Sequence, residues 1–209
     1  MSTGPVSDEA GEKFLERDFV QCFTQMRHYD QQILDIVKFT FTTYTAILGV
    51  AVALYQFSKK EQVNLIPATT AIEFVGFVFG VVMMLFVVRN RVYFVFVARS
   101  INEHRRLFLR GKPLGFENTA GLYTSPAHPD FFNWGSSQSV LLYALSLLNS
   151  IMLGAICFPY MRIRYSLCLG VASLVAHVAP TVVYLKTRDR KTADKAVFGV
   201  EGKSDLTLT

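Results

Sequence analysis

The chain has 209 residues, of which 51% are hydrophobic, and a formal net charge of +5. The length would suit one soluble domain, but the apolar residues are gathered in long blocks with the charged residues between them, which is typical of a membrane protein. The positive charge is therefore loop charge that faces anionic lipid or a protein partner, and nucleic acid is not an expected partner because no long basic arm is present.

The first 37 residues have no apolar core and carry seven acidic residues against Lys13, Arg17 and Arg27. This composition predicts no cleavable signal peptide, so we expect insertion through the first transmembrane helix. Residues 1–9 are expected to be disordered. From residue 10 onward, apolar residues recur with alternating spacings of four and three, which indicates a helix that packs against another helix. This stripe consists of Leu15, Phe19, Cys22, Met26, Tyr29, Ile33 and Ile36.

Four segments are long and apolar enough to cross a bilayer, which requires about 20 helical residues. They are residues 39–57, 68–88, 138–158 and 165–185. Short turns join the first segment to the second and the third to the fourth, so we expect two transmembrane hairpins. The long segment 89–137 separates the two pairs.

The basic residues are distributed unevenly about these spans. Seventeen lysines and arginines lie before the first span, in segment 89–137 or after the last span, against four in the two short turns. The positive-inside rule therefore places both termini and the long segment in the cytoplasm. The sequence has no Asn-x-Ser/Thr glycosylation acceptor, which favours a bacterial origin and hence the inner membrane. The protein is expected to be all-α, with the bilayer as its first partner.

A second helical stripe follows the second span, with the same spacings of four and three. It includes Val97, Ile101, His104 and Phe108. Because a transmembrane hairpin joins it to the first stripe, the two helices must be antiparallel, and together they predict a cytoplasmic stalk within one unit, residues 10–110. The first helix is acidic and the second is rich in arginine, so we expect charge pairing between them.

The remaining chain divides at the second hairpin. Residues 111–137, rich in Gly, Pro and aromatic residues, are expected to form an ordered non-helical loop at the membrane surface. Residues 138–185 form the second hairpin, and residues 186–209 form a cytoplasmic tail.

Within the second stripe, Arg99 and His104 match an Arg-x4-His motif. This match resembles the catalytic motif of HEPN ribonucleases, in which the histidine acts in acid–base chemistry and two subunits often complete the site. Those motifs usually carry a polar amide or charged residue after the arginine, where this chain has Ser100. On a regular helix the two side chains are rotated by about 140°, so they do not converge without a kink or a second subunit. The pattern therefore favours helix packing for His104, with catalysis by Arg99 and His104 as the alternative.

Each span carries one small or polar face. Glu73 lies about 9 Å inside the outer end of its span and needs a partner, a proton or water, for which Gln56 and Thr69 are the nearest candidates. His177 lies near the bilayer midplane, and Asn149 of the third span is a candidate partner at matching depth. These residues either line an ion path or hold the bundle together. Small residues predicted to allow close helix packing are Gly49, Gly76, Gly80, Gly154 and Gly170.

No cofactor or metal site is predicted. His128 and Asp130 lack a third ligand at metal-like spacing, and no phosphate-binding glycine loop or nucleophile elbow is present. Cys157 and Cys168 lie near the outer ends of the third and fourth spans, where either a disulfide or two free thiols fits the sequence.

The arrangement over residues 10–110, in the segments "MRHYDQQILDIVKFTFTTYTAILGVAVALYQF" and "VRNRVYFVFVARSINEHRRLFL", resembles that of SLATT-type bacterial membrane effectors. It is also similar to small membrane accessory proteins found beside some CRISPR and RADAR antiphage systems. The resemblance implies a homo-oligomer that perturbs the membrane or forms a pore when a cytoplasmic partner signals infection. A non-conducting scaffold and a small transporter are the alternatives.

Overall fold

The computed structural model describes residues 8–110, 117–119, 121 and 123–192. Over these ranges the protein is all-helical, and four helices make up most of it. They are α1 (Asp8–Glu61), α2 (Ile66–Arg110), α3 (Ser137–Cys157) and α4 (Ile163–Thr192). Each is long and apolar enough to cross a membrane, which is consistent with a multi-pass membrane protein.

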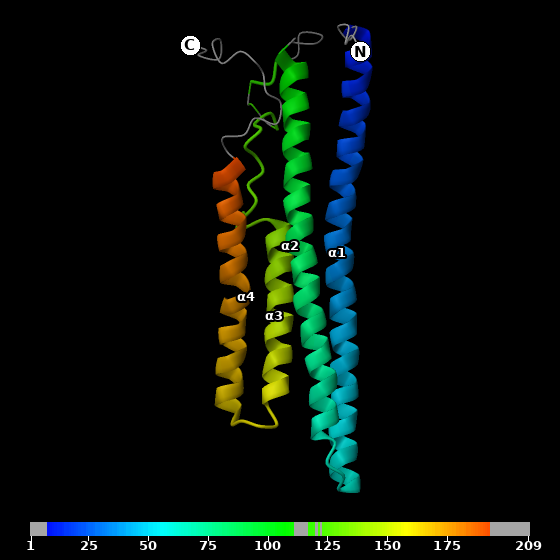
Figure 1. The fold of residues 1–209 in the computed structure, drawn as a ribbon, viewed down its shortest axis with the longest axis vertical. Coiled ribbons are helices and arrows are strands. Elements are labelled where there is room, and N and C mark those ends of the chain that lie inside the picture. Colours follow the sequence, from blue (N-terminus) through cyan, green and yellow to red (C-terminus); the bar gives the residue numbers. More distant parts are fainter. Residues whose placement is uncertain (1–7, 111–116, 120, 122, 193–209) are drawn as a thin grey trace, which may run out of the picture.

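The helices form an elongated bundle in which α1 and α2 run side by side and α3 packs mainly against α2 and α4 (Figure 1). The segment that joins α1 to α2 and the segment that joins α3 to α4 lie at the same end of the bundle, which we call the turn end. At the other end, α1 and α2 extend past the start of α3. We call residues 8–38 of α1 and 89–110 of α2 the distal segments.

Both long helices run without interruption from a distal segment into an apolar segment. The sequence predicts this continuity, because in each helix no Pro or Gly cluster separates the apolar stripe from the adjacent span. Two boundaries differ from expectation. Helix α1 already begins at Asp8, inside the segment predicted to be disordered, and α4 continues to Thr192, inside the predicted tail. The rest of both predicted segments, and residues 111–116 of the loop, lie outside the described residues.

The core consists of two apolar clusters near the middle of the bundle. The first joins α2 to the loop that precedes α3, and to α3 and α4, through Val88, Val92, Val95, Phe131, Phe132, Leu142 and Leu185. The second joins α1, α2 and α3 through Ile33, Met84, Val87 and Leu145. Because the two clusters share α2 and α3, these helices form the centre of the bundle.

A close contact among α1, α2 and α3 centres on Gly80. The Tyr44 hydroxyl of α1 donates a hydrogen bond to Asn149 Oδ1 of α3 at 2.5 Å. Both groups lie directly over Gly80 of α2, where an added Cβ would lie 1.6 Å from Tyr44 Oη and 2.2 Å from Asn149 Oδ1. Only glycine fits this position, because any side chain would displace the buried tyrosine or the asparagine.

The other predicted packing glycines differ in their surroundings. An added Cβ at Gly76 would lie 2.7 Å from the Ile47 side chain, whereas Gly154 and Gly170 face backbone carbonyls across the α3–α4 contact at 3.7 and 3.3 Å. Gly49 is exposed, and nothing lies within 4 Å of an added Cβ. It therefore makes no close packing contact within this chain.

Gly80→Ala is expected to destabilise the protein by about 1–3 kcal/mol, the usual cost of forcing an atom into a packed core. Gly49→Ala is the matched control, since it adds the same methyl group in open space and improves helix propensity by about 0.5–1 kcal/mol. Thermal unfolding of both variants in detergent measures the difference. Equal midpoints for the two variants would contradict the contact at Gly80.

Candidate functional site

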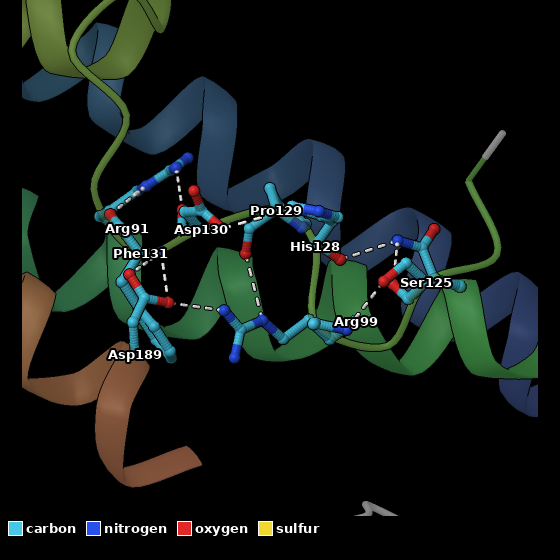
Figure 2. A network of polar contacts seen from close by, with 10 residues as sticks. Arg91, Arg99, Ser125, His128, Pro129, Asp130, Phe131 and Asp189 are labelled. Carbon is cyan, nitrogen blue, oxygen red and sulfur yellow. Dashed lines mark hydrogen bonds and ion pairs between the residues drawn. The ribbon is translucent and has the colours of Figure 1, made fainter. Parts of the chain in front are cut away.

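A cluster of buried polar groups lies where the distal segment of α2 meets the loop before α3 (Figure 2). Arg91 is buried, and its guanidinium donates to the carbonyl oxygens of Phe131 and Asp130 at 2.9 and 2.6 Å and to Gln138 Oε1 at 2.7 Å. Burial lowers the pKa of Arg91, while the neighbouring carboxylates, with Asp189 first, oppose that shift. The side chain stays charged because an arginine pKa starts far above neutral pH.

Arg99, two turns further along α2, links the loop to α4. Its Nε donates to the Pro129 carbonyl at 3.1 Å, and its Nη2 forms an ion pair with Asp189 Oδ1 at 2.7 Å. The Arg99 side chain is 6% exposed and the Asp189 side chain 27%. Asp189 also accepts the backbone N–H of Phe131 at 3.1 Å. One carboxylate therefore connects α4, the loop and α2.

Two further contacts complete the cluster. Asn102 Nδ2 donates to the carbonyl oxygens of Ser125 and His128 at 3.2 and 2.8 Å, so α2 supports the loop backbone over residues 125–131. Gln138 Nε2 donates to Asp30 Oδ1 at 2.8 Å, which brings α1 into the same network. The predicted loop is thus non-helical here, and it is held by side chains of α2.

This arrangement differs from the predicted charge pairing between the acidic and basic helices. Arg91 binds the loop and α3, and Arg99 binds the loop and α4, where Asp189 supplies the carboxylate. Sequence reasoning missed Asp189 because it lies 90 residues from Arg99 and belongs to no periodic pattern. Its one signal is that it stands alone among the basic residues of "KTRDRK".

His104 occupies the interface between α1 and α2, as the stripe predicts. Its ring is fully buried, packs edge-on against Phe19 and donates from Nδ1 to the Ser100 carbonyl at 2.8 Å. Nε2 faces Asp18 Oδ2 at 3.1 Å, an ion pair when the ring is protonated. Arg99 instead binds the loop and α4. The two residues of the Arg-x4-His match therefore contact different elements.

The rest of the predicted stripe is unevenly buried. Ile33 and Ile101 are buried, Tyr29 stacks on Tyr93 of α2, and Leu15, Met26 and Val97 are half-buried. Phe108 is 49% exposed, and Phe14 and Val20, which the stripe does not include, are also exposed. The distal segments thus carry apolar surface that no described residue of the chain covers.

Cys22 lies half-buried in the distal segment of α1, with its thiol 3.8 Å from Asp18 Oδ2. Burial, assisted by the Asp18 carboxylate, raises the pKa of this thiol. The thiol is therefore a poor nucleophile near neutral pH. Cys157 and Cys168 are free thiols, which resolves the alternative that the sequence left open.

Glu73 lies at a cavity of about 850 Å³ formed by all four helices at the turn end. The side chain is 5% exposed, and its Oε2 atom is buried with no hydrogen-bond partner among the described residues. Thr69 lines the same cavity, but its hydroxyl donates to the Leu65 carbonyl. Gln56, the other predicted partner, is exposed and is not among the lining residues.

His177 and Asn149 have separate partners. The His177 ring packs edge-on against Phe77 of α2, and its Nδ1 lies 2.7 Å from the Ser173 carbonyl of its own helix. Asn149 accepts from Tyr44 instead of pairing with His177. Both residues therefore take part in helix packing within the chain.

No protein-family model, curated protein or solved structure matches this chain.

Loss of one partner of the Arg99–Asp189 ion pair is expected to destabilise the protein by about 1–3 kcal/mol. This is less than the cost at a fully buried pair, because Asp189 is partly hydrated. Arg99→Gln and Asp189→Asn test it by thermal unfolding in detergent, together with proteolysis of the loop at residues 125–131. Lys13→Gln is the control, since the exposed Lys13–Glu9 pair should contribute no more than about 1 kcal/mol. If residues 125–131 resist proteolysis equally in both variants and in the wild type, the Arg99–Asp189 ion pair does not hold the loop in place.

Proposed function

We propose that the protein is a non-enzymatic, homo-oligomeric effector of the inner membrane, in which a cytoplasmic stalk controls membrane permeability. The observation that carries the proposal is the continuity of each distal segment with an apolar helix. A displacement of the stalk by a partner would move the first two spans directly, because a helix transmits motion along its axis. The likeness to SLATT-type effectors points in the same direction and includes a role in antiphage defence.

The arginine cluster supports coupling to the second pair of spans. Asp189 lies at the end of α4 and Gln138 at the start of α3, and both bind arginines of the α2 distal segment. A rotation of α2 would therefore strain the ends of α3 and α4 as well. All four spans respond to the stalk in this proposal.

The exposed apolar surface of the distal segments supports an oligomer or a cytoplasmic protein partner. Lipid covers the exposed apolar side chains of the spans, but a cytoplasmic stalk has only water around it. Exposed Phe14, Val20 and Phe108 therefore favour contact with a second copy or a partner. In an oligomer, the exposed Gly49 would allow a helix of a second copy to pack closely against α1.

Both termini are expected in the cytoplasm, because the basic residues gather at the distal end. A fusion after residue 203 should be active when it carries a reporter that works only in the cytoplasm. A fusion at residue 62, in the α1–α2 turn, should be active when it carries a reporter that works only in the periplasm. The opposite pattern would reverse the proposed orientation and remove the cytoplasmic stalk.

Induced expression of the wild type is expected to depolarise the bacterial membrane, measured with a potential-sensitive dye. Glu73→Gln and His177→Leu should reduce the effect if the polar faces control permeability. Glu61→Gln removes an exposed carboxylate from the same helical hairpin and should leave it unchanged. A wild type that never changes the potential, alone or with its genomic neighbours, would favour a non-conducting scaffold or a small transporter.

A further inference from the structure

The cavity at the turn end has the size and composition of a ligand site. Its volume of about 850 Å³ lies within the 300–1,000 Å³ typical of small-molecule pockets. Its walls are mainly aliphatic and come from every helix, including Leu48, Leu147, Ile151 and Leu174. Such walls suit an apolar body, and a pocket of this kind usually has a few polar groups that fix the orientation of the ligand.

One polar group in the cavity lacks a partner. Glu73 is nine-tenths buried or more, and Oε2 has no donor among the described residues. Two neighbouring hydroxyls donate elsewhere, Thr69 to the Leu65 carbonyl and Ser150 to the Ser146 carbonyl, and the Ser166 hydroxyl forms no hydrogen bond to Oε2. A carboxyl group left without a donor in an apolar site is costly, so a bound group that donates to it would be favoured.

The charge of the cavity indicates the chemistry of that group. Among the described residues that line it, Glu73 is the only acid, and no lysine, arginine or histidine is present. A ligand cation would therefore face one carboxylate and no competing positive charge. Ser166 also lines the cavity, and its hydroxyl has no hydrogen-bond partner among the described residues, so it is a candidate for a second acceptor.

We propose that this cavity binds a lipophilic amine, with the ammonium group on Glu73 and the apolar body among the side chains of the four helices. The ammonium donates to Glu73 and Ser166, and the bilayer supplies the route of entry for the apolar body. This inference does not rest on the proposed control of permeability, since binding is measured on the purified protein.

Equilibrium dialysis of dodecylamine against the full-length protein in neutral phosphatidylcholine nanodiscs tests the proposal, with empty nanodiscs as background. Saturable binding to the wild type is expected, and Glu73→Gln should weaken it by about 10- to 100-fold, the range of a charge-assisted hydrogen bond. Glu61→Gln, which removes an exposed carboxylate outside the cavity, should bind like the wild type. Ala155→Leu, which fills part of the cavity, should also weaken binding.

Dodecanol, with the same chain and no charge, distinguishes the amine site from a groove for bilayer lipid. If dodecanol binds as tightly as dodecylamine, or Glu73→Gln binds as tightly as the wild type, the cavity is an apolar lipid groove and the proposal is wrong. Matching elution volumes and melting temperatures for each variant and the wild type show that a loss of binding is not a loss of fold.

Discussion

Burial of two guanidinium groups, on Arg91 and Arg99, determines much of the structure around the distal segments. A buried arginine needs acceptors for up to five N–H donors, and an unpaired buried charge costs several kcal/mol. The loop before α3 supplies most of them as backbone carbonyl oxygens, which are free because the loop is not helical. Asp189 supplies the one carboxylate that α4 brings to the cluster. The conformation of the loop and the position of the end of α4 therefore both follow from two side chains of α2.

The apolar part of the bundle is held together by different means. Its hydroxyl groups mostly donate to carbonyls one turn back in the same helix, as Thr40, Ser146 and Thr181 do. Such bonds satisfy the polar groups but do not join helices. Contact between helices depends instead on close packing over Gly80 and on a few hydrogen bonds, among them Tyr44–Asn149 and the 3.6 Å bond from Ser146 Oγ to Met84 Sδ. Toward the turn end, the small residues of α3 and α4 leave space that no larger side chain fills, and the cavity beside Glu73 results.

Local patterns in the sequence predict what depends on local physics. Hydropathy predicts the four apolar helices, and the spacing of four and three places Ile33, Ile101 and His104 in a buried interface, because both signals repeat within a few turns. Contacts that depend on tertiary structure have no such signal. Asp189 meets Arg99 only because α4 returns along α2, and Tyr44, an aromatic residue within a span, gives no sign of its bond to Asn149. The partner predicted for Asn149, His177, was wrong for this reason: equal depth in the bilayer does not specify the direction in which a side chain points.

The glycines of α2 affect how its apolar segment can move against α1. Gly76 and Gly80 are one helical turn apart, so a shift of α2 by one turn in one direction would place Gly76 beneath Tyr44 but would bring Ile72 to the present position of Gly76, where an added Cβ already lies 2.7 Å from the Ile47 side chain. A shift in the other direction would place Met84 beneath the same ring, where an added Cβ alone already collides. The interface therefore resists a one-turn shift in either direction. Since the distal segment of α2 is continuous with this helix, the close contacts at Gly76 and Gly80 also fix the position of that segment along α1.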